Sequence, residues 1–504
     1  MLHKSFYEMI NGVLPNRNYR CMVIVVLILN VLIINHFFVG NTLLSTNLFK
    51  IPTVPVEIEL PWSLIDPKSV TEESLSTSDS NQSPELQEKV RLYTPTDPTK
   101  YPELGPGPTP ALISTHDYAF DGPYVGWPLQ RLCNEVKQTP GLVFLCDNNS
   151  GGVGNIRNFI LTCIRYAIEA GASGIVMPKI QRRSAEDLSD LFSKGFQPFY
   201  YFFDQQHFKY AMSTYCPQVT VYDQVTDIPN VEFVRSLTGF YPKNLNKDFD
   251  GCDERGVNRH LDFFREKFDA WIRNTNQTLN AQHPTTVRFK WATFFEWPIY
   301  RDGPEFANTF GDLLRIRPDI QHMAAATIRE LSAAMGVPPN PSAIEIPFLG
   351  AHLRTEKDAL SIWPKFNQQT DGYLEQAIKG KHTHIYLACG NTTEVDRFAE
   401  RASHKNITVL AKNDLLKGDD FAALQALTWD QQALVDYLVL QKSSFFTGCS
   451  FSSFTMNIAV KRHTMTSGIH SRQWRSPGDQ YSWLVGNFES WYGDWMFMLE
   501  CMWP

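Results

Sequence analysis

From about residue 111 onward, short apolar runs alternate with stretches of helical periodicity. The run "GLVFLC" (Gly141–Cys146) has the length of a buried strand, and "IRNFILTCIRYAIEAG" follows it as a predicted helix. The apolar residues at 3.6-residue spacing on this helix are Ile160, Cys163, Ile164, Ala167 and Ile168. "SGIVMPKI" predicts the next strand, and "HLDFFREKFDAWIR" and "IQHMAAATIRELSAAMG" predict later helices. Strand, helix and strand in this order indicate a parallel sheet.

The segment "GVPPNPS" (Gly336–Ser342) separates this series from a second one. Proline and glycine interrupt helices and strands, so the segment predicts a domain boundary. Beyond it, "AIEIPFLGAHLR", "THIYLACG", "NITVLA" and "SFFTGC" predict strands, and amphipathic stretches between them predict helices. The fold class is therefore α/β. We expect two Rossmann-like domains, 111–338 and 339–504, that face each other across a cleft and bind ligands at the carboxyl ends of their strands.

The first 110 residues have a different pattern. Cys21–Val39 contains no formal charge over 19 residues, about the minimum for a membrane-spanning helix. Three Lys or Arg residues precede it, so the positive-inside rule places residues 1–20 in the cytosol and the rest of the chain in the lumen, as in a single-pass type II membrane protein. A cleaved signal peptide is the alternative, but no A-x-A site follows the run. Residues 40–110 are polar and rich in proline, and predict a disordered stem.

Composition limits the classes of function. A net charge of −7, with 20% charged and 43% hydrophobic residues, is ordinary for a globular chain and argues against a broad nucleic-acid surface. Nine cysteines without a C-x-x-C pair argue against a structural zinc cluster. A few disulfides suit a lumenal chain, but spacing does not reveal their pairing. The sequence also contains five N-x-S/T sequons, at Asn81, Asn148, Asn276, Asn391 and Asn406.

A glycine-rich stretch, "SGGVGNIRN" (Ser150–Asn158), lies between the first strand and the first helix. Glycines let backbone N–H groups approach an anion, and a helix start adds partial positive charge. Asn155 and Arg157 would lie on the first helical turn, where arginine suits a phosphate. Gly152 and Gly154 match two glycines of a dinucleotide fingerprint, but Arg157 replaces the third. A NAD oxidoreductase is therefore disfavoured, and an ordinary tight turn remains the alternative.

Two other predicted strand ends carry groups that suit a phosphate. His352 and Arg354 share one face of an extended chain, where a switchable imidazole lies beside a fixed cation. Ser452 and Ser453 precede a helical pattern, which suits either a phosphate site or ordinary capping. Asp436, on the preceding helix, either accepts hydrogen bonds from a guanine edge or lies on the surface. Three such elements at strand ends of two α/β domains indicate a nucleotide-sugar transferase.

At these residues the sequence resembles the GDP-fucose protein O-fucosyltransferase superfamily, over roughly residues 140 to 470. The resemblance is strongest at "HLR" and in "VDYLVLQKSSFFTGCSFSSFTMNIAVKRH". It implies a GT-B-like fold with the acceptor on the first domain and the GDP-sugar on the second. It also implies inverting transfer of fucose from GDP-fucose to a hydroxyl of a protein or glycan, without a metal or a cofactor other than that donor. The membrane would be that of the Golgi or the endoplasmic reticulum, with residues 21–39 in the bilayer.

The resemblance implies a role for each candidate residue. Two are catalytic: Arg354 would bind the β-phosphate and stabilise departing GDP, and Asn155 would lie near fucose and phosphate. Asp436 would pair with guanine. The complete set implied to bind the donor is Gly152, Gly154, Arg157, His352, Asp436, Ser452, Ser453, Phe454 and Thr455.

The sequence departs from the family pattern in two places. Some relatives carry a glutamate base in the glycine loop, where this chain has Gly151, Gly152 and Val153. Cys389-Gly390-Asn391 stands where relatives often carry Thr-Asp. The alternative function is therefore a catalytically inactive lumenal protein of the same fold that binds a GDP-sugar or another partner. The tryptophan-rich end predicts core packing, with an acceptor surface as the alternative; its tryptophans include Trp483, Trp491, Trp495 and Trp503.

Overall fold

The computed structural model describes residues 118–240, 264–275, 278–290, 295–356, 363–475, 477–486 and 500–504. All of them belong to one compact unit, Glu88–Pro504. The expected cytosolic tail (1–20), transmembrane anchor (21–39) and stem (40–110) lie outside the described residues. Across the ranges given above, no helix combines the length and apolarity that crossing a bilayer requires.

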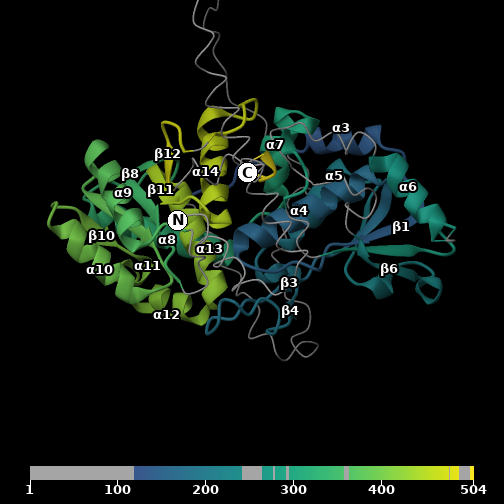
Figure 1. The fold of residues 1–504 in the computed structure, drawn as a ribbon, viewed down its shortest axis with the longest axis horizontal. Coiled ribbons are helices and arrows are strands. Elements are labelled where there is room, and N and C mark those ends of the chain that lie inside the picture. The colour runs from purple at the N-terminus through teal and green to yellow at the C-terminus, as the bar shows by residue number, and fades with distance from the viewer. Residues whose placement is uncertain are drawn as a thin grey trace, which may run out of the picture. The chain divides into compact units, whose positions relative to one another are not determined.

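The first half of the described chain forms a five-stranded sheet in the order β5-β2-β1-β7-β6 (Figure 1). Every pair of neighbours in it is parallel. Its strands are β1 (Thr139–Leu145), β2 (Ala172–Val176), β5 (Thr220–Tyr222), β6 (Arg235–Phe240) and β7 (Thr285–Phe289). A short antiparallel pair accompanies the sheet, formed by β3 (Ile180–Gln181) and β4 (Phe196–Gln197). The predicted first strand, helix and second strand are confirmed.

The second half forms another five-stranded parallel sheet in the order β10-β9-β8-β11-β12. Its strands are β8 (Ile346–His352), β9 (His384–Ala388), β10 (Thr408–Leu410), β11 (Ser443–Cys449) and β12 (Ser482–Val485). Counted along the chain, this is the 3-2-1-4-5 order of a doubly wound sheet, which confirms the Rossmann-like topology. The order reverses between β8 and β11, and ligands of such sheets bind beside the carboxyl ends at that reversal.

Helices connect the strands of both sheets (Figure 1). They are α3 (Trp127–Glu135), α4 (Val153–Glu169), α5 (Gln205–Tyr215), α6 (Phe264–Asn274), α7 (Pro304–Thr309), α8 (Pro318–Ala334), α9 (Phe366–Lys379), α10 (Thr392–Ser403), α11 (Lys412–Leu415), α12 (Gly418–Ala426), α13 (Trp429–Gln441) and α14 (Ser453–Ser467). Short 3₁₀ turns are η2 (Phe199–Tyr201), η3 (Val225–Asp227), η4 (Val231–Phe233), η8 (Ile299–Asp302) and η9 (Phe310–Leu313). The helices predicted on both sides of the Pro-rich boundary segment are therefore present.

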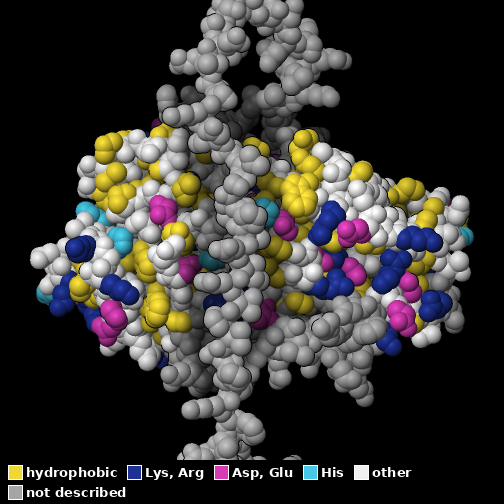
Figure 2. Space-filling view, turned by 90° about the horizontal axis from the view of Figure 1, so that it is seen from above, with side chains coloured by type: hydrophobic (Ala, Val, Ile, Leu, Met, Phe, Trp, Pro, Cys, Tyr) yellow, Lys and Arg dark blue, Asp and Glu magenta, His cyan; other side chains and the backbone are white. Residues whose placement is uncertain are grey.

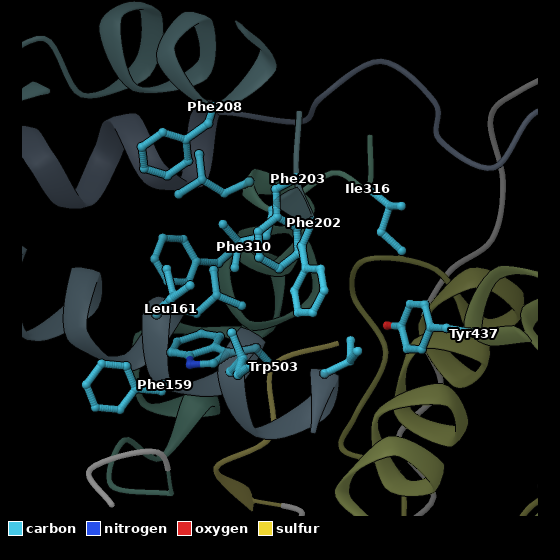
Figure 3. Packing of buried hydrophobic residues seen from close by; sticks show 14 of the residues in the cluster. Phe159, Leu161, Phe202, Phe203, Phe208, Phe310, Ile316, Tyr437 and Trp503 are labelled. Carbon is cyan, nitrogen blue, oxygen red and sulfur yellow. The ribbon is translucent and has the colours of Figure 1, made fainter. Parts of the chain in front are cut away.

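The end of the chain returns to the first sheet's helix α4. Trp503 is fully buried, and its ring lies 4.8 Å from that of Phe310 (Figure 3). Asn158 on α4 donates to the Cys501 carbonyl (2.7 Å) and accepts from the Trp503 amide (2.9 Å). Core packing is thus confirmed for Trp503, whereas Trp483 is exposed on β12 and Trp491 and Trp495 lie outside the described residues. The last residues pack with the first sheet although they follow the second in sequence.

Two disulfides join described residues, Cys133–Cys216 and Cys146–Cys163, and Cys501 is also disulfide-bonded. Cys146 directly follows β1 and Cys163 lies in α4, so this bridge encloses the glycine-rich stretch. The bridge fixes the strand end to the helix that carries the loop.

Removing this bridge is expected to destabilise the protein. The bridge joins residues that are 17 apart in the sequence. A crosslink over a loop of this length lowers the entropy of the unfolded chain and so stabilises the folded protein by about 3 kcal/mol. We expect a C146S/C163S variant to melt at a clearly lower temperature than wild type, and Cys389→Ser, which removes a free thiol, to lie much closer to wild type. Equal melting temperatures for the two variants would contradict this expectation.

Candidate active site

The glycine-rich stretch and the serine pair, far apart in the sequence, are in contact. Gly152 is the N-cap residue of α4, and Ser452 is the N-cap residue of α14. A Cβ atom added to Gly154 would lie only 2.7 Å from the carbonyl carbon of Ser453 and 2.9 Å from the amide nitrogen of Phe454. The two helices can approach this closely because Gly154 has no side chain. The N-terminal ends of α4 and α14, each with partial positive charge, therefore meet.

Three predicted residues cluster beside this contact at the reversal point of the second sheet. His352, the last residue of β8, has its Nδ1 2.7 Å from the Thr455 hydroxyl and its ring 4.7 Å from the Phe454 ring. Gly448 on β11 makes room for them, since a Cβ there would lie 2.6 Å from the Thr455 methyl group. Figure 1 shows β8, β11 and α14 next to one another. The carboxyl ends of β8 and β11 thus carry these side chains together, where the topology predicts a ligand site.

His352 is a neutral imidazole in the folded protein. Burial and the nearby positive charge of Arg354 lower the pKa of His352 to about 3. This lowered pKa argues against the expectation of an imidazole that switches charge near neutral pH, and its causes, desolvation and Arg354, depend on the folded surroundings of the ring. At neutral pH, His352 contributes hydrogen bonding and ring packing rather than charge.

This pKa predicts a pH-dependent stability. The unfolded chain binds a proton at this histidine below about pH 6.5, whereas the folded protein does so only near pH 3. The free energy of unfolding therefore decreases as the pH falls from about 6.5 towards 3, by at most about 1.4 kcal/mol per pH unit. Above about pH 6.5, His352 does not change the free energy of unfolding. We expect His352→Gln to remove this part of the slope in unfolding experiments between pH 4 and 7. Replacing the exposed His404 with glutamine serves as the control, and an unchanged slope in His352→Gln would refute the assignment.

Arg354 follows β8 and is held by its main chain and its side chain. Its amide donates to Gln369 Oε1 (2.9 Å), and its carbonyl accepts from Gln369 Nε2 (2.7 Å). Its guanidinium, 12% exposed, contacts the Glu356 carboxylate and lies 5.6 Å from the Trp363 ring centroid. The sequence reading overlooked Glu356, although it lies two residues further in the "HLRTEKD" stretch. The cation is therefore oriented before any ligand binds.

Asn155 lies over the glycine loop, as expected for a residue of the first turn of α4. Its amide nitrogen is 3.0 Å from the position of a Cβ on Gly151, whose φ of +97° requires glycine. Its side chain is half-buried, and within the described residues no hydrogen bond engages it. The Asn155 amide is thus placed where it can meet a ligand of the loop.

Arg157 does not face the loop, which corrects the expectation that it would meet an anion. Its guanidinium is buried and donates to the main-chain oxygens of Trp503 (2.7 Å from Nη1) and Pro504. The return of the chain end to α4 supplies these acceptors, and no local periodicity predicts such a distant partner. Arg157 therefore anchors the C-terminal segment.

Asp436 is buried in α13, so the alternative that it is an exposed helix acid is wrong. Its two carboxylate oxygens accept from the Tyr386 hydroxyl (2.7 Å) and the Lys412 ammonium (2.6 Å). No sequence pattern indicated Lys412 as its partner, because Lys412 lies on a separate short helix, α11. A guanine contact for Asp436 remains a prediction, and a guanine edge would have to share this carboxylate with Lys412.

Charge is mixed on the one face of the molecule that Figure 2 draws. On the face drawn in Figure 2, described Lys and Arg side chains are interspersed with Asp and Glu side chains. This distribution agrees with the net charge of −7 and differs from the single-sign stripe of a nucleic-acid surface.

The chain resembles a known protein family and several solved structures. The family model for GDP-fucose protein O-fucosyltransferase matches residues 142–465 of the 504, more than half of the chain. Among curated proteins, no sequence matches. The chain is similar to POFUT1 in a crystal structure in complex with GDP, at 12% sequence identity. The comparison covers 70% of this chain and 100% of that chain, with a TM-score of 0.41. Fucosyltransferase NodZ from Bradyrhizobium is 16% identical, with 64% and 93% covered and a TM-score of 0.34. The chain is a glycosyltransferase that belongs to the GDP-fucose protein O-fucosyltransferase family.

Proposed function

We propose that this protein transfers fucose from GDP-fucose, with inversion at the anomeric carbon, to a hydroxyl of a protein or glycan acceptor. The observation that carries the proposal is the contact of Gly154 with Ser453 and Phe454. It brings two helix N-termini to one place beside His352 and Arg354, in a chain of the fucosyltransferase family. An anionic diphosphate is favoured by this combination of backbone N–H groups and cation.

In this proposal the diphosphate binds at the N-terminus of α14 and the acceptor approaches from the first sheet. The Ser452 hydroxyl supports this placement, because its residue is only 5% exposed and no hydrogen bond within the described residues engages the hydroxyl. The hydroxyl oxygen itself keeps some exposed surface, so a phosphate at this position would replace water as its partner. Thr455 is already engaged with His352 and acts by holding the imidazole.

The reaction is a direct displacement. The acceptor oxygen forms a bond to the anomeric carbon, while the bond from that carbon to the β-phosphate oxygen breaks and its electron pair stays with GDP. The acceptor proton is released to solvent. Negative charge grows on the β-phosphate, so Arg354 binds more strongly in the transition state than in the ground state. The glycine loop offers no carboxylate at Gly151, Gly152 or Val153, and the stabilisation of departing GDP carries most of the catalysis.

Proton NMR of the slow hydrolysis of GDP-fucose tests the stereochemistry without a known acceptor. Water then takes the place of the acceptor, and we expect the first fucose formed to have the anomeric configuration opposite to that of the donor. Retention would refute a single displacement. GDP binding without any release of fucose, with or without secretory glycoproteins added, would favour the alternative of an inactive GDP-sugar-binding protein, which the lack of a loop carboxylate also favours.

We further propose that residues 21–39 anchor the protein in the Golgi or endoplasmic reticulum membrane, with the catalytic part in the lumen. The Cys133–Cys216 and Cys146–Cys163 disulfides support this location, because such bonds form and persist in oxidising compartments.

A lumenal location predicts an N-linked glycan at Asn406. Its side chain is exposed, in a turn where its φ is +57°, and surface turns suit such acceptors. Asn148 is less accessible, since it is half-buried and donates to the Phe289 carbonyl (3.1 Å). We expect Asn406→Gln, expressed in a eukaryotic secretory pathway, to lose the mass of one glycan and Asn148→Gln to lose none. An unchanged mass for Asn406→Gln would contradict the assignment.

A further inference from the structure

We propose that Arg183 is a second arginine of the donor site, which binds the diphosphate of the nucleotide from the side of the first sheet. This inference rests on the proposed function and adds a residue to it. Arg183 follows β3 in the stretch "IQRRSAED" and belongs to no motif of the sequence. The structure alone brings it to the glycine loop.

The side chain of Arg183 lies against the N-terminus of α4. Its Nη1 is 3.4 Å from the position of a Cβ on Gly152, the N-cap residue. Its Nη2 donates to the Leu188 carbonyl (2.9 Å), and the side chain is half-buried. The guanidinium is thus oriented by Leu188 and lies beside the space that a side chain at Gly152 would fill.

The segment that carries Arg183 is fixed to the glycine loop by hydrogen bonds. Asn149 donates to the Lys179 carbonyl (2.6 Å) and accepts from the Gln181 amide (3.1 Å). Ser150 donates to the Leu191 carbonyl (3.0 Å). The glycine loop and the main chain on both sides of Arg183 are therefore held together.

One chain of contacts leads from Arg183 to Arg354 through the meeting helices. The Arg183 guanidinium lies next to the space in which a Gly152 side chain would stand, and Gly154 packs closely against the main chain of Ser453 and Phe454. The Phe454 ring in turn packs on His352, two residues before Arg354.

A second chain of contacts joins the same two arginines along a different path. The Arg183 amide lies 3.4 Å from Asp430 Oδ2, next to Trp429 at the start of α13. A Cβ on Gly390 would lie 3.1 Å from Trp429 and 2.9 Å from Glu356, which pairs with Arg354. Both paths pass a carboxyl end of the second sheet, the first at His352 of β8 and the second at Gly390, two residues after β9.

The chemistry of a nucleoside diphosphate fits this pair of cations. Its two phosphates carry charge on oxygens that point in several directions, and each guanidinium offers two parallel N–H donors. The N-terminus of α4 adds partial positive charge on the side of Arg183. We therefore assign Arg354 to the side of the second sheet and Arg183 to the side of the first.

Binding of GDP and of guanosine to the full chain, measured by calorimetry, tests this assignment. We expect Arg183→Ala to weaken GDP binding about 10- to 100-fold and to leave guanosine binding unchanged, because guanosine has no phosphate. The neighbouring Arg182 is exposed, so Arg182→Ala is the matched control and is expected to bind GDP like wild type. Arg183→Lys keeps the charge without the planar fork and is expected to lie between wild type and Arg183→Ala.

The outcomes separate this inference from the proposed function. Wild-type GDP affinity in Arg183→Ala would overturn the inference alone. Equal weakening of GDP and guanosine would show a structural role and would also overturn it. A folded wild-type protein that binds no GDP would overturn both. If the melting temperature shows that Arg183→Ala does not fold, Arg183→Lys decides, and wild-type GDP affinity in that variant would refute bidentate binding.

Discussion

Replacing Arg354 with alanine is expected to lower the rate of GDP-fucose turnover about 10²- to 10³-fold. Gln369 holds the main chain of Arg354 just after β8, and Glu356 orients its guanidinium. Negative charge grows beside this guanidinium only as the bond to fucose breaks. The loss should therefore appear mainly in kcat and only weakly in the KM for GDP-fucose. Steady-state release of GDP across a range of donor concentrations measures both constants.

Two further variants show whether the loss of rate is specific to the guanidinium of Arg354. Arg354→Lys retains a cation beside Glu356, so it is expected to recover part of the rate. Arg397 on α10 has a side chain that is 51% exposed, and Arg397→Ala is expected to leave turnover within about twofold, since exposed ion pairs contribute little. Turnover by Arg354→Ala at the wild-type rate would remove Arg354 from the mechanism.

Replacing Gly154 with alanine is expected to separate the two helix N-termini. In an ordinary helix, alanine in place of glycine stabilises by about 1 kcal/mol. Here the added Cβ would meet the Ser453 main chain at 2.7 Å, and a main chain cannot rotate away as a side chain can. Overpacking of this kind costs about 1–3 kcal/mol, so the clash exceeds the gain. We expect a lower melting temperature and a loss of GDP affinity of at least about tenfold.

Gly122 provides the control for this substitution. A Cβ on Gly122 would meet no atom within 4 Å, and its φ is not positive. Gly122→Ala is therefore expected to match wild type in melting temperature and in GDP affinity. If Gly154→Ala behaves in the same way, the contact between the glycine loop and the serine pair does not shape the site.

Periodicity and turn chemistry predicted most of the fold. The alternation of apolar runs with amphipathic stretches indicated two α/β halves, and both sheets have the expected parallel strands. The order of the strands could not be read from the sequence, because strand pairing depends on contacts between distant segments. The same limit applies to the chain end, whose return to α4 through Asn158 and Trp503 has no local signature.

The candidate site was predicted only in part, for the same physical reason. The apolar run correctly placed His352 at the carboxyl end of a strand, and the serine pair lies at a helix start, whereas Arg354 lies two residues beyond the strand. Spacing could not tell which way Arg157 points, because the oxygens it binds belong to residues far along the chain. The sequence did not indicate Arg183, because only folding brings this residue close to the glycine loop.

Hydrogen exchange with and without GDP tests most directly whether the glycine loop and the serine pair form one donor site. We expect GDP to slow exchange of backbone amides in residues 150–158 and 450–457 together, because both helix N-termini would donate to the same ligand. Arg354→Ala should reduce protection in both segments. Protection confined to one segment, or absent from both in a folded protein saturated with GDP, would contradict a shared site.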